Sequence, residues 1–336
     1  MIILRFCIPV FIVLILVFGV ASVQANETKD NVTSNPIIIK FMDNMVKEHG
    51  FKREEVEAVL TQAKVLPIII EKMSRPAEAW PWHRYRKIFL KEKRINQGVE
   101  FWRENTAILE AAEKKYGVPE EIILAILGVE TRFGRIKGGF RVVDALVTIG
   151  VDYPKRSKYF LKELAQVFIL SKEENFDPLA LEGSYAGAMG MAQFMPSSYR
   201  HFAVDFDGDG VRDLLNNKAD AVGSIASYLS RHNWKAGDPI ATRATVSDKS
   251  HQKFVKKGMK PKVKIADIGK YGVTAADKYP GELKASLIEL EQEDGMEYWL
   301  GMGNFYAITR YNHSNLYAMA VYQLSEEIKV AYNKAK

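Results

Sequence analysis

The first part of the chain repeats apolar positions with the period of an α-helix. Ile37–His49 and Arg53–Gln62 both show this spacing, and Val99–Tyr116 forms a longer amphipathic segment that Gly117 ends. These patterns predict a helical first layer. Residues 118–235 continue mostly helical around a loop-rich middle.

The pattern changes between about Asp238 and Thr309. Three runs there have strand character, Ala241–Val246, Ala285–Leu290 and the aromatic-rich Met296–Ile308, and glycine, proline and lysine separate them. This arrangement predicts a small antiparallel β insertion. Beyond Asn312 the apolar positions return to helical spacing, and no internal repeat argues for a solenoid.

The order of these patterns predicts a mainly α protein of the α+β class. A chain of 336 residues is long enough for two or three domains with a sizeable buried core. The expected segments are a signal peptide at 1–25, a helical domain at 26–116, a core at 117–236, a small β domain at 237–309 and a C-terminal helix at 310–336 that returns to the preceding helices.

The N-terminus has the pattern of an export signal. Arg5 precedes a near-continuous apolar run, Phe6–Val23, and the small residue Ala25 stands before polar Asn26, so we expect cleavage after Ala25. The alternative is an uncleaved anchor, because the run is about as long as a spanning helix. Both interpretations place the body outside the cytoplasm, and we expect a periplasmic protein. The one cysteine, Cys7, lies in this leader, which excludes disulfides and thiolate chemistry from the mature chain.

Composition narrows the class of partner. The apolar fraction of 47% excludes a disordered or collagen-like chain. The formal charge of +6 suits weak attraction to an anionic polymer. Five lysines between Lys256 and Lys264 form one local cluster, and in an exported protein a solvated face is the favoured interpretation, so no nucleic-acid partner is predicted.

One acidic residue stands where the helical pattern demands a hydrophobe. Residues 118–121, Val-Pro-Glu-Glu, open a helix, and Ile123, Ile126 and Leu127 then share a face with Glu130. Apolar neighbours and the nearby negative end of the helix dipole both favour an uncharged carboxyl. A glutamate kept protonated near neutral pH can protonate a glycosidic oxygen. This helix alone leaves open a structural ion pair of Glu130 with a following arginine, Arg132 or Arg135.

Two motif segments favour a catalytic acid over a structural ion pair at Glu130. Residues 128–134 read GVETRFG, and residues 183–199 read GSYAGAMGMAQFMPSSY. Together they resemble the lysozyme-like lytic transglycosylases of bacterial cell-wall metabolism, specifically the lytic murein transglycosylase B family. The resemblance runs from about Tyr85 to Tyr322. It includes Tyr153-Pro154, Arg156, Tyr159-Phe160, Asp205–Gly210 and Ile308–Asn312.

The resemblance implies a lysozyme-like catalytic core and cleavage of the β-1,4 bond between N-acetylmuramic acid and N-acetylglucosamine without water, which leaves 1,6-anhydromuramic ends. Glycosidases generally use two carboxyl groups. In this family one glutamate acts first as acid and then as base, and Glu130 matches its position. The substrate's N-acetyl carbonyl stabilises the charge, so neither a second carboxylate nor a catalytic cofactor is expected.

The same resemblance assigns substrate contacts. Ser184 lies close to Glu130 and helps place the N-acetyl group or the carboxyl, Gln193 contacts the sugar, and Arg156 meets a carboxylate of the peptide stem or lactyl group. Lys155 stands where some relatives carry a second arginine. The family's groove-lining aromatic residues match Tyr85, Tyr159, Tyr228, Tyr311 and Tyr317, and its polar contact matches Asn312.

The glycine-rich segment from Gly183 has a phosphate-binding interpretation as well. It lacks a preceding strand and the Gly-Lys-Ser/Thr ending, which argues against that interpretation. We expect its small residues to let the backbone approach a sugar closely.

An acidic loop follows the spacing of an EF-hand. Oxygen ligands stand at its first, third and fifth positions and glycine at its sixth, but the twelfth position is Asn216, which cannot supply the usual bidentate carboxylate. Related enzymes carry an EF-hand-like site with a displaced last ligand. The expected structural Ca²⁺ ligands are Asp205, Asp207, Asp209, the Val211 carbonyl and Asp220. A metal-free acidic turn is the alternative.

The sequence therefore predicts an enzyme that remodels peptidoglycan, with glycan strands as substrate and with cell-wall synthesis or division proteins as candidate partners. A membrane contact is expected only if the leader is retained. Three alternatives stay open: a hydrolytic muramidase on the same fold, a noncatalytic glycan-binding or scaffold protein, and a calcium-sensing module.

Overall fold

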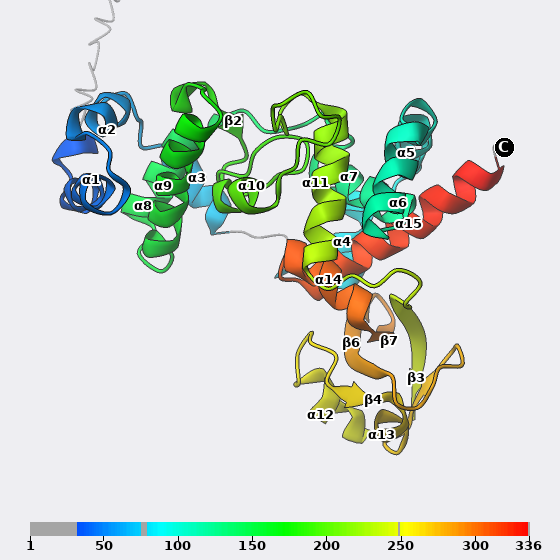
Figure 1. The fold of residues 1–336 in the computed structure, drawn as a ribbon. Coiled ribbons are helices and arrows are strands. Elements are labelled where there is room, and N and C mark those ends of the chain that lie inside the picture. Colours follow the sequence, from blue (N-terminus) through cyan, green and yellow to red (C-terminus); the bar gives the residue numbers. More distant parts are fainter. Residues whose placement is uncertain (1–31, 75–78, 248, 335–336) are drawn as a thin grey trace, which may run out of the picture. The chain divides into compact units, whose positions relative to one another are not determined.

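The computed structural model of the chain describes residues 32–74, 79–247 and 249–334 (Figure 1). The predicted leader and its cleavage after Ala25 lie outside these residues. Within the described ranges, every helix is too short or too polar to cross a lipid bilayer.

The N-terminal third is helical, as predicted. A 3₁₀ turn at Val32–Ser34 precedes α1 (Pro36–His49), α2 (Arg53–Leu60), α3 (Pro67–Met73), α4 (Trp82–Phe89), α5 (Glu92–Glu104) and α6 (Thr106–Tyr116). The helices expected at 37–49 and 53–62 are confirmed. Gly50 ends α1 in a left-handed conformation with φ of 67°, which glycine adopts without the steric cost of a Cβ.

The prediction of a single helix over Val99–Tyr116 is wrong, because the helix is interrupted at Asn105. This residue leaves the helical region with φ of −127° and separates α5 from α6. Its side-chain Nδ2 donates to the Phe101 carbonyl at 2.8 Å, a local bond of the kind that lets asparagine compete with helix continuation. The predicted stop at Gly117 is confirmed, with φ of 70°.

Seven further helices of the described residues contribute to the main hydrophobic core. They are α7 (Glu120–Thr131), α8 (Val142–Asp152), α9 (Ser157–Glu173), α10 (Pro196–Phe202), α11 (Lys218–Arg231), α14 (Gly303–Tyr311) and α15 (Asn315–Lys334). α15 packs along α7 and α5, and α8 packs along α9 (Figure 1). α7 is deeply placed, with all residues from Ile122 to Gly128 buried. Each large apolar side chain buried in this way stabilises the fold by about 1.5–3 kcal/mol.

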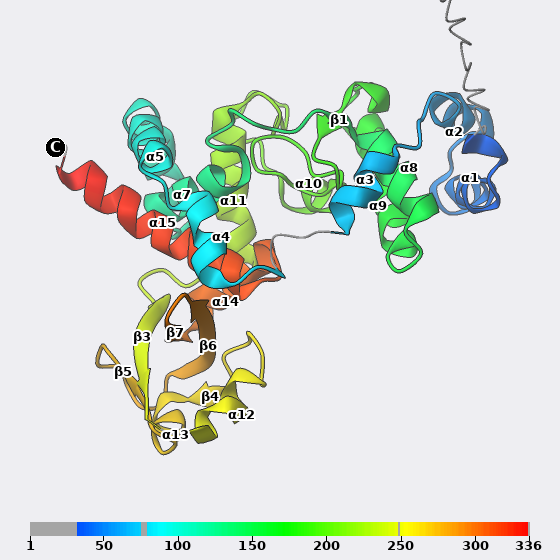
Figure 2. The same cartoon turned by 180° about the vertical axis from the view of Figure 1, so that it is seen from behind.

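The β insertion is present as a five-stranded antiparallel sheet. Its strands are β3 (Ala241–Val246), β4 (Val263–Lys264), β5 (Val273–Ala275), β6 (Lys284–Gln292) and β7 (Gly295–Gly301), in the order β4-β6-β7-β3-β5 (Figure 2). A turn at 249–251 and two short helices, α12 (Gln252–Val255) and α13 (Ile265–Gly269), cover it. A separate pair, β1 (Phe140–Arg141) and β2 (Glu182–Gly183), flanks the core together with a 3₁₀ turn at Pro178–Ala180.

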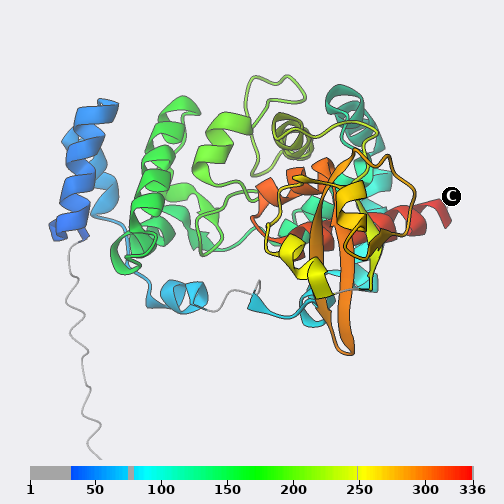
Figure 3. The same ribbon diagram turned by 90° about the horizontal axis from the view of Figure 1, so that it is seen from below.

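The alternation of side chains along β6 joins this sheet to the helices. Ala285 and Leu287 point into a small core within the β insertion, whereas Ile288 and Leu290 point the opposite way into the main core. The long β6–β7 hairpin, drawn in orange in Figure 3, therefore has one face in each core.

The strand predicted over Met296–Ile308 is correct only in its first half. β7 ends at Gly301 and α14 begins at Gly303. Asn304 is buried in the first turn of α14, accepts from the Lys235 amide at 2.8 Å and donates to the carbonyls of Lys235 and Asp238. These long-range bonds favour the helix, whereas the short apolar run taken alone does not distinguish a strand from a buried helix.

Candidate active site

Glu130 lies in the last turn of α7. Ile123, Ile126 and Leu127, which share its face, are fully buried, and Glu130 itself is half-buried. The prediction that this acid follows an apolar face is therefore confirmed. The helix places the carboxyl at its carbonyl end, where the backbone offers no N–H donors.

A tyrosine from the far end of the chain contacts this carboxyl. The Tyr317 hydroxyl, in the first turn of α15, donates to Glu130 Oε1 at 2.6 Å. Tyr317 is 2% exposed. Burial raises the pKa of Tyr317 well above 10, and the charge of Glu130 adds to the rise. The hydroxyl therefore stays a donor throughout the physiological pH range.

The two arginines considered as ion-pair partners lie just beyond the helix. Arg135 forms its salt bridge with Glu100 of α5, with Nη2 and Oε2 2.7 Å apart. Arg132 caps α7 in a left-handed conformation, and its side chain is exposed.

The turn that follows Glu130 is strained. Arg132, Phe133 and Gly134 have consecutive positive φ values of 50°, 61° and 80°. A non-glycine residue in this region costs on the order of 1–3 kcal/mol. Thr131 holds the turn, because its Oγ1 donates to the Met191 carbonyl at 2.8 Å and accepts from the Gly134 amide at 2.9 Å. The strain thus lies directly beside Glu130, where surrounding contacts maintain it.

The glycines of residues 183–190 correct one expectation. A Cβ on Gly183 would lie 2.2 Å from the Ala188 carbonyl oxygen, and one on Gly190 would lie 2.3 Å from the Leu214 carbonyl oxygen. These glycines therefore let one backbone segment pack against another within the protein. The expectation that they leave room for a sugar is not supported at these two positions.

Ser184 and Gln193 organise the same segment. Ser184 Oγ accepts from the amides of Ala186 and Ala188, at 3.3 and 3.0 Å. Gln193, with φ of 51°, donates its Nε2 to the carbonyls of Lys137 and Gly190. Both side chains are half-buried. The amide oxygen of Gln193 receives no hydrogen bond from the described residues and is the group suited to a ligand.

Three of the predicted tyrosines, Tyr228, Tyr311 and Tyr317, form one cluster with Phe194. The rings of Tyr311 and Tyr317 are stacked at 6.4 Å, and Tyr228 meets Tyr311 edge-on at 4.9 Å. The hydroxyl of Tyr311 donates to the Ala192 carbonyl at 2.6 Å, and that of Tyr228 donates to the Arg310 carbonyl at 2.5 Å. These bonds fix the cluster rigidly and lock α14 against α11 and residues 183–195.

The other predicted contacts are more scattered. Tyr85 is 2% exposed and packs between Trp82 and Phe89, and its part in lining a glycan groove stays a prediction. Tyr159 is 40% exposed, with the Arg156 guanidinium 4.9 Å above its ring. The structure leaves the Arg156–Tyr159 pair accessible.

Asn312, the last predicted contact, ends α14. It is half-buried in an extended conformation, and its carbonyl accepts from the Ser314 amide at 2.7 Å.

Sequence reasoning missed several residues around Glu130. Thr131 and Phe194 lie within the quoted motifs without an assigned part, yet Thr131 holds the strained turn and Phe194 packs against Tyr228 and Tyr311. Glu163 of α9 is a buried carboxylate that sequence reasoning also left without an assigned part. It accepts from the amide and hydroxyl of Ser197 at 2.9 and 2.7 Å, and so caps α10.

The acidic loop has the geometry expected of a cation site. Carboxylate oxygens of Asp205, Asp207 and Asp209 lie within 4.8 Å of one another. Asp205 also accepts from the amides of Gly208, Asp209 and Gly210, which curls the backbone around it. Hard carboxylate oxygens gathered in this way fit Ca²⁺.

Asp220 reaches this loop from α11. It is fully buried, and its two oxygens accept from the amides of Phe206 and Asp213, both at 2.7 Å. Burial raises the pKa of Asp220, and the two N–H donors oppose the rise. Asp220 therefore ties the ends of the loop together, and its part as a direct ligand stays a prediction.

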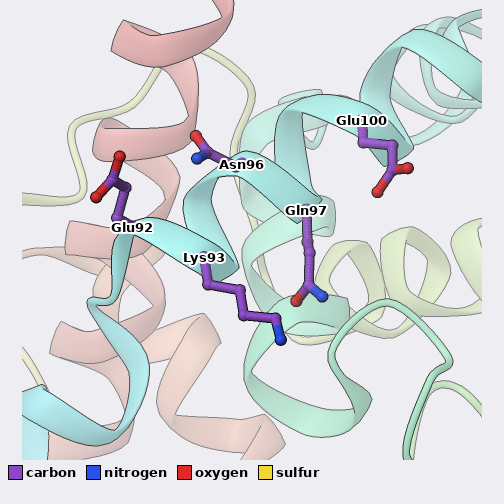
Figure 4. Close-up of a pocket in the computed structure, with 5 residues that line it drawn as sticks. All are labelled: Glu92, Lys93, Asn96, Gln97 and Glu100. Atoms are coloured by element: carbon purple, nitrogen blue, oxygen red, sulfur yellow. The ribbon is translucent and has the colours of Figure 1, made fainter.

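A hollow of about 590 Å³ lies elsewhere, along α5. Its described lining residues, Glu92, Lys93, Asn96, Gln97 and Glu100, all come from that one helix (Figure 4). None of the predicted site residues lines it.

The sequence matches the family described as the transglycosylase SLT domain over residues 34–326. The chain belongs to this family. It is 42% identical over 308 residues to membrane-bound lytic murein transglycosylase B of Escherichia coli, a match that covers 89% of this chain and 84% of the relative.

Solved structures of lytic transglycosylases support the same family assignment. Soluble lytic transglycosylase SltB1 of Pseudomonas aeruginosa superposes with a TM-score of 0.83 at 44% identity, covering 89% of this chain and 100% of that one. Lytic transglycosylase Slt35 of E. coli, in complex with calcium, superposes with a TM-score of 0.80 at 42% identity, covering 89% and 94%. The predicted lysozyme-like fold and lytic transglycosylase function are confirmed, and the protein is an enzyme.

Proposed function

We propose that this enzyme cleaves the β-1,4 bond between N-acetylmuramic acid and N-acetylglucosamine and releases 1,6-anhydromuramic ends, with Glu130 as the catalytic residue. The observation that supports this most directly is the half-buried Glu130 at the end of an apolar helix, with Tyr317 donating to its Oε1 at 2.6 Å. Because Oε1 is held as an acceptor, we assign the transferable proton to Oε2.

The reaction needs two proton transfers through this one carboxyl. Protonated Glu130 donates to the bridging oxygen as the bond from muramic C1 to that oxygen breaks. The resulting carboxylate then takes the proton from the 6-hydroxyl of the same muramic residue, while the oxygen of this 6-hydroxyl bonds to C1. The proton count is conserved and water does not enter. Tyr317 holds the carboxyl in place through both transfers, at no cost of reorganisation.

The neighbouring side chains suit an amino-sugar chain. We assign sugar contacts to the Gln193 amide oxygen and the exposed ring of Tyr159, and a peptide-stem contact to Arg156. We assign Ser184 and Asn312 to placing the sugar near Glu130. Tyr228, Tyr311 and buried Tyr85 act as the rigid support of Tyr317.

A more distant relative supports the choice of substrate. SltB3 of Pseudomonas aeruginosa has been solved in complex with NAG-anhNAM-pentapeptide, an anhydro product, and superposes with a TM-score of 0.75 at 26% identity, covering 86% of this chain and 78% of that one. Since lytic transglycosylases of this kind bind peptidoglycan fragments, we propose peptidoglycan strands as the substrate here.

The acidic loop is proposed to hold a structural Ca²⁺. Asp205, Asp207 and Asp209 supply carboxylate oxygens, with the Val211 carbonyl and Asp220 completing the set. The calcium complex of Slt35 supports this choice of ion. The ion would stabilise the loop, and no step of the chemistry above needs it. We also propose a periplasmic location, since one relative carries the name membrane-bound and the substrate lies outside the cytoplasm.

Digestion of purified sacculi tests the proposed reaction. The mature protein should release muropeptides lighter by one water than the hydrolytic products, and the Glu130→Gln variant should release almost none. Mass spectrometry of the soluble fraction distinguishes the two product types. Reducing muramic ends without anhydro products would instead identify a hydrolytic muramidase, and unchanged release by the variant would remove Glu130 from the chemistry.

A further inference from the structure

A buried arginine on α5 is left without an anionic partner. Arg94 is 6% exposed, and its Nη1 has no hydrogen-bond partner among the described residues. The Phe89 ring lies 5.1 Å from its guanidinium carbon and compensates only part of the lost hydration. An unpaired cation in such a place is unfavourable, and proteins keep buried charges where they are paired or bind a ligand.

A second guanidinium lies beside it. Gly98, one turn after Arg94 on the same face of α5, packs against Phe133, and a Cβ there would lie 3.1 Å from the Phe133 ring. The rings of Phe101 and Phe133 are 5.8 Å apart, which fixes the turn after Glu130 on this face of α5. Arg132, immediately before Phe133, is close enough for its charge to act on Arg94. Burial first and this charge second lower the pKa of Arg94 to about 10.

The pair has the chemistry of a carboxylate receptor. No salt bridge within the described residues involves Arg94 or Arg132, so neither guanidinium is paired with an acid, and the packing of Phe133 on Gly98 and Phe101 brings residue 132 to this face of α5. A planar guanidinium matches a carboxylate through paired N–H donors. Because Arg132 follows Glu130 by two residues, an anion bound there would belong to the part of the substrate near the scissile bond. In peptidoglycan the carboxylates near that bond are carried by the peptide stem on muramic acid.

We propose that Arg94 and Arg132 form a subsite for a carboxylate of the peptide stem, distinct from the contact assigned to Arg156 on α9. This subsite rests on the proposed function, since it requires a peptidoglycan strand at Glu130. Arg94 would supply a buried guanidinium beside the Phe89 ring, and the exposed Arg132 would supply the second one from the surface.

The test compares two substrates and two methionine variants. Arg94→Met keeps a similar side-chain volume and removes the buried charge. Its matched control is Lys93→Met, which removes one exposed positive charge from the adjacent position of α5 (Figure 4). Each variant is assayed on stem-bearing glycan strands and on strands stripped of their peptides by an amidase, with anhydro ends counted by mass spectrometry.

For Arg94→Met we expect kcat/KM on stem-bearing strands to fall about tenfold or more, as for loss of a charged hydrogen bond. On stripped strands it should change by less than about twofold, and Lys93→Met should match the wild type on both substrates. The unfolding temperature of Arg94→Met should stay level or rise, since an unpaired buried charge is removed. Equal losses on both substrates, or no loss on either, would overturn the subsite.

A second variant keeps the test independent of folding. Arg132→Asn changes an exposed side chain, and asparagine tolerates the left-handed backbone at this position. It should show the same selective loss on stem-bearing strands. If the wild type released no anhydro ends from either substrate, the proposed function itself would fail. Anhydro release that is insensitive to both arginines would leave the function standing and remove only the subsite.

Discussion

The carboxyls of Glu130 and Asp220 differ in their donors, although both come from helices and both are shielded from water. Asp220 lies at the amino end of α11, is fully buried, and accepts one backbone N–H at each oxygen. Glu130 lies at the carbonyl end of α7, is half-buried, and accepts from a side-chain hydroxyl. The backbone donors favour the charged form of Asp220 and oppose the rise that burial causes in its pKa, whereas the Tyr317 hydroxyl can donate to either form of the Glu130 carboxyl.

The same functional group therefore serves two purposes because of where the fold puts its donors. Two amides of the acidic loop, those of Phe206 and Asp213, converge on Asp220 and make it structural. At the end of a helix, only tertiary contacts can supply a donor, and here one comes from α15. This difference predicts that variants at the two positions affect different properties.

Glu130→Gln should have the largest effect and should act on catalysis alone. Loss of a general acid lowers kcat by about 10²- to 10⁴-fold. The free energy of unfolding should change by less than about 1 kcal/mol, because glutamine can still accept from Tyr317. Turnover on sacculi and urea denaturation of the same preparation measure both quantities. A large loss of stability would show that Glu130 is structural as well.

Asp220→Ala should lower stability and leave the catalytic rate nearly unchanged. It leaves the amides of Phe206 and Asp213 buried without acceptors, which we expect to lower the free energy of unfolding by about 3 kcal/mol. The fraction that remains folded should retain kcat close to that of the wild type. Asp220→Asn keeps one acceptor oxygen and should lose roughly half as much. A stable Asp220→Ala protein would contradict the part assigned to these two bonds.

Calcium should stabilise the loop without changing the chemistry. At a free concentration of about 100 times its Kd, a bound ion adds about 2.7 kcal/mol, which raises the unfolding temperature by about 5 °C. Chelation should reverse the shift while initial rates at 25 °C stay constant. The doubly substituted Asp205→Asn, Asp207→Asn protein should show no shift on addition of calcium. An equal shift in that protein would place the ion elsewhere.

Tyr317→Phe should lower the catalytic rate less than Glu130→Gln does. It removes the hydroxyl bonded to Oε1 but keeps the ring stacked on Tyr311. We expect kcat to fall about tenfold, the scale of one hydrogen bond to a charged group, with unchanged KM. Tyr332→Phe, on the same helix and stacked on Trp102, is the control and should retain full activity. A rise in KM with unchanged kcat would point to a binding contact instead.

Alkaline titration tests how strongly the tyrosine cluster around Glu130 is buried. Burial raises the pKa of Tyr311 and Tyr317 well above 10, and the Glu130 charge adds to the rise. The unfolded chain therefore releases these protons first, so their stabilisation is complete below pH 10 and is lost as the pH rises further. The unfolding temperature should fall above pH 10, and less steeply in Tyr317→Phe. Tyrosinate absorbance of the folded protein should appear late for these two residues.

Much of the local structure was predictable because it depends on neighbours in the chain. The helix at 37–49, the strand at Ala241–Val246 and the apolar face before Glu130 follow from short periodicities. The break at Asn105 and the helix at Gly303–Tyr311 were missed. In both places buried hydrogen bonds to particular partners decide between conformations that the apolar pattern allows.

The sequence by itself determined the family, the place of Glu130 at the end of an apolar helix, and the spacing of acids in the Asp205 loop, because short-range geometry and motif order depend on neighbours along the chain. Only the tertiary structure decided which groups surround those acids. Tyr317 meets Glu130 across 187 residues, Tyr85 turns inward, and Gly190 gives room to the Leu214 carbonyl. These contacts depend on how helices pack together, and no local pattern encodes that arrangement.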